Sequence, residues 1–227
     1  MNILDLYHLQ NIQYHYYDDL QKLILDPTHP IEEAPNSICL KNSPDPVKLI
    51  EEASLLYPDE ITVLDISSIC LSEDLIESLY GLQSVEVLIV SSIQVSNADS
   101  SLIESLISYI LSCDFLYDLD ISMNSWLRDY HIRELLPIVS QLQKLNVSNC
   151  HKISDESIYH ICSYQEGEKL KSSSHPLHNT TSSSCSITYL DVSGCIKVTD
   201  DGFEQILNNL RNIQTLVLKG CLKITGL

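Results

Sequence analysis

Residues 187–199 read Ile-Thr-Tyr-Leu-Asp-Val-Ser-Gly-Cys-Ile-Lys-Val-Thr. Side chains alternate along a strand, so Leu190 and Val192 point to the same side of a short strand. Ile187 turns into the same core one step earlier, and Cys195 ends the strand as a small, mostly buried residue with a weak S–H donor. One such unit cannot bury its apolar face alone, so the pattern predicts neighbours of the same kind.

The same pattern recurs along the chain. Its central strand residues are Leu64, Leu88, Leu119, Leu145, Leu190 and Leu216. The steps are 24, 31, 26, 45 and 26 residues long, and the step of 45 is one period of 26 plus 19 further residues. A period of about 26 lies in the range of leucine-rich repeats. The sequence therefore predicts an α/β solenoid, a curved parallel sheet on the concave side with helices on the convex side.

One position after each strand carries a small residue with a hydrogen-bond donor. It is filled by Asn124, Cys150, Cys195 and Cys221. With the (Ser/Thr)-Asp that follows some copies, this resembles the cysteine-containing leucine-rich repeats of F-box/LRR proteins, over residues 60–227. The resemblance implies substrate recognition or an adaptor role in SCF-type ubiquitin-dependent degradation. Residues 1–60 contain no F-box pattern, so a ligase core component is an expected partner only if an F-box is supplied elsewhere.

Residues 1–60 are expected to form an N-terminal cap or degenerate repeats with a Pro-rich loop. One period before Leu64 lies Ile38, which predicts a degenerate repeat, and Ile12 one period earlier is equally compatible with a helical cap. Residues 18–24 can form a short helix. Pro46 suits the start of a helix over residues 47–56, and Tyr57-Pro58 ends it.

Residues 61–227 are expected to form the repeat array, interrupted by a disordered Ser-rich insert at about 166–186. Helical patterns alternate with the strands over residues 73–79, 101–111, 132–139 and 202–210. Asp200 is the predicted N-cap of the last of these helices. At the C-terminal end, Leu216, Leu218 and Ile224 are expected to lie at an exposed edge of the sheet, because no further copy follows them.

The amino-acid composition limits the classes of partner that are expected. The chain has 31 acidic and 13 basic residues and a formal net charge of −18. This balance argues against nucleic-acid binding, which needs clustered Lys and Arg, and favours a basic protein partner or simply a soluble acidic surface. No signal peptide and no membrane-spanning apolar run are present. Cysteines used as buried apolar residues fit a reducing compartment, so a cytoplasmic or nuclear location is expected.

The concave face is the candidate binding surface, because solenoids use such faces to bind partners. The candidate binding residues are Asp65, Asp118, Asp120, Asn146, Tyr189 and Asp191. Period-two alternation places them on one face, where stacked like charges would repel unless a cation pairs with them. The alternative reading is that these aspartates serve solubility alone.

No catalytic motif is found, so no enzyme activity and no cofactor are expected. His175, His178 and Cys185 match no zinc spacing, so no metal site is predicted. The sequence predicts a protein-interaction module, with a ubiquitin-ligase adaptor as its finer form. The alternatives are a leucine-rich-repeat scaffold or regulatory protein outside ubiquitination, or a small metal-binding or enzymatic protein on the same scaffold.

Overall fold

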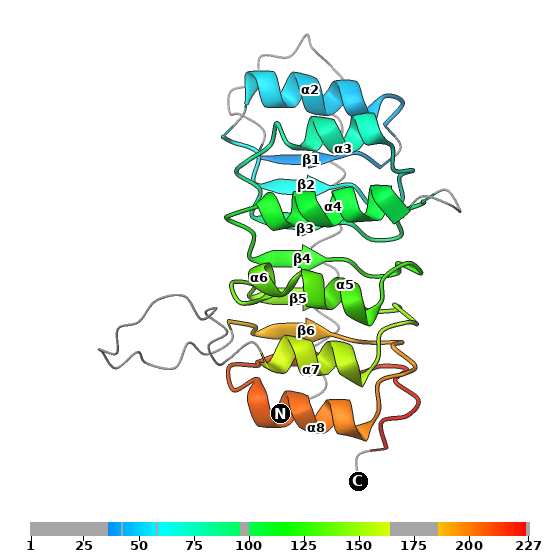
Figure 1. The fold of residues 1–227 in the computed structure, drawn as a ribbon. Coiled ribbons are helices and arrows are strands. Elements are labelled where there is room, and N and C mark those ends of the chain that lie inside the picture. The colour runs from blue at the N-terminus through cyan, green and yellow to red at the C-terminus, as the bar shows by residue number, and fades with distance from the viewer. Residues whose placement is uncertain (1–35, 42, 58, 96–99, 164–185, 226–227) are drawn as a thin grey trace, which may run out of the picture.

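The computed structural model describes residues 36–41, 43–57, 59–95, 100–163 and 186–225. In these residues seven short strands form one parallel sheet, with the strands side by side in the order of the chain (Figure 1). The strands are β1 (Ser37–Cys39), β2 (Val63–Asp65), β3 (Val87–Ile89), β4 (Asp118–Asp120), β5 (Lys144–Asn146), β6 (Tyr189–Asp191) and β7 (Thr215–Val217). Helices lie over one face of the sheet (Figure 1), which confirms the predicted α/β solenoid.

The register of the sheet follows the apolar ladder of the sequence. Leu64 pairs with Leu88, and each later central leucine pairs with the next, through to Leu190 with Leu216. Ile38 pairs with Leu64, so the degenerate repeat predicted there is confirmed. The Ile12 copy, the helix predicted over 18–24 and the Ser-rich insert lie outside the described residues.

Seven helices cover the sheet in the described part of the chain. They are α2 (Pro46–Leu56), α3 (Glu73–Leu79), α4 (Ser100–Ser112), α5 (Asp129–Glu134), α6 (Leu136–Val139), α7 (Asp155–Ser163) and α8 (Asp200–Asn209). Pro46 stands in the first turn of α2, where a missing N–H costs nothing, and the Asp45 carboxylate caps the helix by accepting from Lys48 N–H at 3.1 Å. The helix over residues 73–79 is confirmed at both ends.

Two helix predictions are wrong in detail. The helix expected over 132–139 is two short helices, α5 and α6, because Pro137 has no N–H to continue a helical ladder. Asp200 is the first residue of α8, and the N-cap is Thr199, whose hydroxyl accepts from Asp201 N–H at 3.2 Å. The Asp200 carboxylate has another partner, described below.

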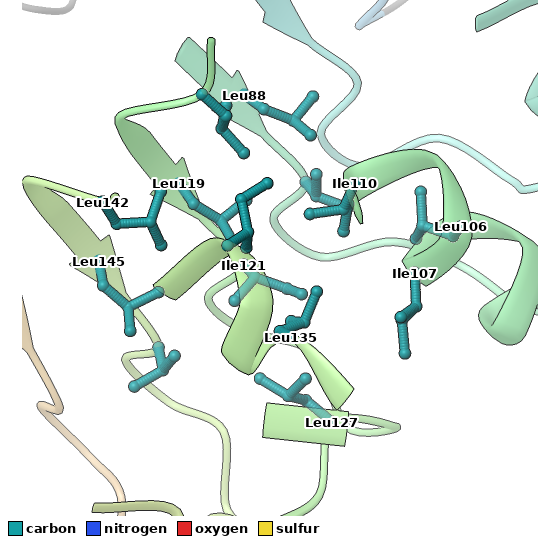
Figure 2. Close-up of a cluster of buried hydrophobic side chains, with 14 of the residues drawn as sticks. Leu88, Leu106, Ile107, Ile110, Leu119, Ile121, Leu127, Leu135, Leu142 and Leu145 are labelled. Carbon is teal, nitrogen blue, oxygen red and sulfur yellow. The ribbon is translucent and has the colours of Figure 1, made fainter. Parts of the chain in front are cut away.

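The core lies between the sheet and the helices. Leu119 from β4 and Leu106 and Ile110 from α4 are fully buried in it, and Figure 2 shows them as members of one cluster of buried side chains. Burying a side chain of this size contributes about 1.5–3 kcal/mol. Each strand gives only one central residue to this layer, so the core is continuous only because neighbouring repeats add to it.

A second ladder joins the last repeats outside the sheet. Asp129 accepts from the backbone N–H and the hydroxyl of Ser154, at 2.8 and 2.9 Å. Asp155 binds Thr199 in the same way, at 2.8 Å to each group, and Asp200 binds Thr225 at 2.8 and 2.7 Å. Each aspartate is therefore fixed to the repeat that follows it. This explains why Asp200 does not cap its own helix.

A left-handed residue turns the chain after every strand from β2 to β7. It stands four residues after the strand centre, at Ser68, Ser92, Met123, Asn149, Gly194 and Gly220, with φ between 56° and 78°. This conformation lets each turn stack on the next, as where Gly194 N–H donates to the Lys219 carbonyl at 2.8 Å. Gly194 also lies so close to the Asn149 amide that a Cβ would collide with it, whereas a Cβ at Gly220 would stay 3.6 Å from its nearest neighbour.

The last strand is the least covered. All three residues of β7 are half-buried, and Leu216, Leu218 and Ile224 pack only partly against the core. Among the described strands, β7 is thus the edge strand expected there, with its apolar residues half-buried rather than fully exposed.

These turns give a matched test. Gly220→Ala should lower the free energy of unfolding by about 1–2 kcal/mol, the cost of a left-handed non-glycine residue. Gly194→Ala should cost more, because its methyl group also meets Asn149. In an Asn149→Ala background the two substitutions should cost the same. Urea unfolding measures the wild-type chain, the two glycine variants, the Asn149→Ala parent and its two double variants. If Gly194→Ala costs as much in the Asn149→Ala background as in the wild-type chain, this account of the turn is contradicted.

Candidate functional site

The face of the sheet opposite the helices is the candidate site, and we call it the open face. On β4 the fully buried Leu119 points to the helices, whereas Asp118 and Asp120 beside it are half-exposed on the open face. The same alternation holds along the array, so the strand residues on either side of each central residue line this face. The predicted placement of Asp118 and Asp120 on one face is therefore confirmed.

The register gathers five of the six predicted binding residues. Asp118 lies beside Lys144, and Lys144 lies beside Tyr189. One row along, Asp120, Asn146 and Asp191 are neighbours on the same three strands. Asp65 stands apart on β2, separated from Asp120 by Ile89.

The residues that directly follow the central residue of each strand form one row across the open face. Four side chains of this row bind the turn that follows their own strand. The Oδ1 atoms of Asp65, Asp120, Asn146 and Asp191 accept from the backbone N–H two residues on, at 2.8, 2.9, 3.0 and 2.8 Å. The donors are Ser67, Ser122, Ser148 and Ser193. These are Asx turns, in which a short polar side chain replaces a backbone acceptor. The recurring (Asp/Asn)-(Ile/Val)-Ser of the sequence is the signal that could have predicted them.

The second oxygen of each aspartate in this row is also engaged. Asn146 Nδ2 donates to Asp120 Oδ2 at 2.8 Å, and the Tyr189 hydroxyl lies 3.5 Å from Asp191 Oδ2. On β2, Cys39 Sγ lies 3.4 Å from Asp65 Oδ2. Asp65 and Asp191 are each only 8% exposed as a result. The row is thus a set of side chains held in fixed positions.

Asp118 is the exception, because it pairs with a cation. Lys144 Nζ lies 2.9 Å from Asp118 Oδ2, with the lysine side chain 47% exposed. A pair so open to solvent contributes about 0–1 kcal/mol. Lys144 thus offsets part of the repulsion between aspartates that the sequence predicts for this face.

The repulsion expected between stacked aspartates is not realised as predicted. No two acidic residues lie directly beside each other on neighbouring described strands. Ile89 separates Asp65 from Asp120, and Asn146 separates Asp120 from Asp191. The register neighbours of Asp118 are Val87 and Lys144. A net negative field remains. Burial and the charges of Asp191, Asp120 and Asp118 together raise the pKa of the Tyr189 phenol to about 12, and burial is the largest of these causes. Burial also raises the pKa of Asp120.

An apolar patch lies next to this polar region on the open face. Val63 of β2 pairs in register with Val87 of β3, Ile89 stands two residues further along β3, and all three are half-exposed. The open face therefore passes from apolar on β2 and β3 to acidic on β4 to β6.

The cysteine positions lie at the joints between repeats. Cys150, Cys195 and Cys221 donate S–H to the carbonyls of Ile121, Val147 and Val192 in the preceding repeat, at 3.5, 3.2 and 3.1 Å. Asn124 does the same with its amide, which lies 2.7 Å from the Val90 carbonyl. Cys150 and Cys195 are fully buried, so the burial predicted for them is confirmed. Burial raises their pKa values to about 11 and 12.

In the described residues, no three His, Cys, Asp or Glu side chains are placed to hold a metal ion. Among the helices described, none has the length and apolar content to cross a membrane.

Fold and open face together define a leucine-rich-repeat solenoid. One similar solved structure is described as the crystal structure of the Rad7 and Elc1 complex in yeast, with a TM-score of 0.56 and 17% sequence identity. The likeness covers 79% of this chain and 41% of the chain it matches, so this chain spans less than half the length of that neighbour. At this identity the likeness shows the fold alone. No protein-family model and no curated protein matches the sequence.

The thiols provide a first test. Cys70 is exposed, whereas Cys150 and Cys195 are buried with raised pKa values. Because the thiolate is the reactive form, iodoacetamide should label Cys70 at least about tenfold faster than either buried thiol in the native protein. Peptide mass spectrometry after timed labelling measures this. Comparable rates at all three would show that the joints open readily.

The negative field provides a second test. Asp118→Asn and Asp191→Asn together should lower the Tyr189 pKa, because fewer carboxylates then oppose the phenolate. The titration is followed by ¹³C NMR of labelled tyrosines, with Tyr189→Phe to assign the signal. The control is Asp59→Asn with Asp114→Asn, two exposed aspartates elsewhere. An unchanged Tyr189 titration in the first variant would mean that these charges do not act on the open face.

Proposed function

We propose that the chain is a protein-interaction module that binds a segment of a partner protein on the open face. The observation that carries this is the hydrogen-bonded row of Asp120, Asn146 and Asp191 on an uncovered sheet. Side chains already fixed by Asx turns lose little freedom on binding, so more of the interaction energy appears as affinity. An enclosed pocket is not needed for this function.

The proposed partner segment is basic with apolar residues on one side. Among the described strand residues of the open face, four aspartates outnumber the single cation Lys144, namely Asp65, Asp118, Asp120 and Asp191. A segment with Lys or Arg would be steered to β4–β6 by this field. Its apolar side chains would then reach Val63, Val87 and Ile89 on the neighbouring strands.

The finer proposal is an adaptor or substrate-recognition role in SCF-type ubiquitin-dependent degradation. It is supported by the resemblance of the repeats to cysteine-containing leucine-rich repeats and by a neighbour in fold that forms a protein complex. The array would supply recognition, and the ligase contact would come from residues outside it. A cytoplasmic or nuclear location is part of the same proposal. Capture of ligase subunits with the tagged chain would separate it from a scaffold role outside ubiquitination.

The test removes charge without removing the turn. Asn146 makes the same Asx turn as the aspartates, so Asp191→Asn should keep the bond to Ser193 N–H. Asp120 is left intact because its Oδ2 accepts from Asn146 Nδ2, and a second amide there would face that donor. Asp118→Asn with Asp191→Asn should reduce partner capture from cell extract at low salt by about fivefold or more, with little difference at high salt.

Asp59→Asn with Asp114→Asn serves as the matched control, because it removes two exposed charges elsewhere on the array. Quantitative mass spectrometry compares the captured proteins, and thermal unfolding confirms that both variants are folded. If the open-face variant captures the same partners at the same salt dependence, the binding surface lies elsewhere.

A further inference from the structure

A row of lysines lies at the edge of the sheet where the strands end and the helices begin, the edge to which the arrowheads point in Figure 1. Lys152, Lys197 and Lys223 each stand seven residues after the central leucine of β5, β6 and β7. Backbone bridges place Lys197 beside Ser154 and Lys223 beside Thr199 of the preceding repeat. The lysines thus follow one another from repeat to repeat. We call this row the basic edge.

The basic edge is confined to the last three repeats. The corresponding residues after β2, β3 and β4 are Leu71, Val95 and Trp126. Lys197 and Lys223 are exposed and Lys152 is half-exposed. In the part of the chain that the structure describes, none of the three lies within ion-pair distance of a carboxylate. In a chain of net charge −18, three successive unpaired lysines are unexpected.

The acidic residues near this edge have other partners. The carboxylates of Asp155 and Asp200 are bound to the N–H and hydroxyl of Thr199 and Thr225. Glu156 lies 3.7 Å from His160 on its own helix. Asp201, in the first turn of α8, faces the positive end of that helix dipole. The lysines therefore stay available to an outside anion.

The positive charge of Lys152, at the start of the basic edge, acts on the buried His131 of α5. Burial and the charges of Arg128 and Lys152 together lower the pKa of His131 to about 4, and burial is the largest of these causes. The His131 ring is buried and its Nδ1 accepts from Arg128 N–H at 3.1 Å. His131 is thus neutral and adds no charge of its own, and the field comes from the two cations.

Exposed apolar side chains accompany the lysines. Ile196 and Leu222 immediately precede Lys197 and Lys223, and they are 43% and 81% exposed. Large apolar groups beside unpaired cations, in consecutive repeats, form a surface that offers both charge and apolar contact. A partner that carries carboxylates and apolar side chains in alternation matches both features.

We propose that the basic edge is a second interaction surface, which binds an acidic protein segment with interspersed apolar residues. Lys152, Lys197 and Lys223 would pair with its carboxylates, and Ile196 and Leu222 would contact its apolar side chains. Two strand spacings separate the outer lysines, about 10 Å, which about three residues of an extended segment span. At physiological salt the remote carboxylates of the chain are screened beyond about 8 Å, so they oppose the approach of an acidic segment only weakly. This surface is separate from the open face and does not rest on the function proposed for it.

The test uses a fluorescein-labelled peptide of alternating glutamate and leucine, with fluorescence anisotropy as the readout. The wild-type chain should bind it, and binding should weaken as salt rises. Replacing Lys152, Lys197 and Lys223 together by glutamine should weaken binding by about tenfold or more. The matched control replaces three exposed cations elsewhere, Lys48, Arg133 and Arg211, by glutamine, and should leave binding unchanged.

Further variants and competing ligands identify the class of partner that the basic edge binds. Ile196→Ser with Leu222→Ser should weaken binding of this peptide but not of a glutamate–serine peptide. Thermal unfolding confirms that each variant is folded. The proposal is overturned if the wild-type chain does not bind the glutamate–leucine peptide, or if the lysine variant binds it equally well. It is also overturned if single-stranded DNA or anionic lipid vesicles compete at lower concentration than the peptide, since the edge would then serve a different class of ligand.

Discussion

Every feature of this protein depends on one constraint: a single repeat cannot bury its own apolar face. The central residue of each strand, such as Leu119, is buried only because the strands on both sides carry leucine at the same height. The parallel register therefore has to be kept from repeat to repeat. Three further ladders keep that register outside the strands. They are the stacked left-handed turns, the S–H bonds of Cys150, Cys195 and Cys221 to the preceding repeat, and the aspartate bonds to Ser154, Thr199 and Thr225.

The same register creates the two proposed surfaces. On the open face it lays Asp118 against Lys144 and Asp120 against Asn146, so charge is distributed across strands rather than stacked. At the edge it lines up three lysines that the sequence separates by 45 and 26 residues. A solenoid turns a position within a repeat into a row on a surface, and here two positions give rows of opposite sign. The structure thereby offers a basis for binding two partners of different charge on one array.

Most of the fold could be predicted from the sequence, because the apolar spacing and the cysteine position repeat in several copies. Counting one period back from Leu64 predicts even the weak copy at Ile38, which pairs with Leu64 in the sheet. The partners of polar side chains could not be predicted in the same way. Asp200 looks like an N-cap in the sequence, but its partner is Thr225 in the next repeat, which only the stacking brings near. Asp65 and Asp191 look like exposed surface charges in the sequence, but both are buried and bind the turn that follows their own strand.

The central claim is that each repeat is stable only through its neighbours. The most direct measurement is native-state hydrogen exchange in Leu119→Ala, a change that should cost about 2–5 kcal/mol at the middle of the array. The account predicts that the backbone amides of β3 and β5 lose protection together with those of β4, because their central residues lose a packed neighbour. Full protection of β3 and β5 alongside an unprotected β4 would contradict it, since the repeats would then be stable one by one.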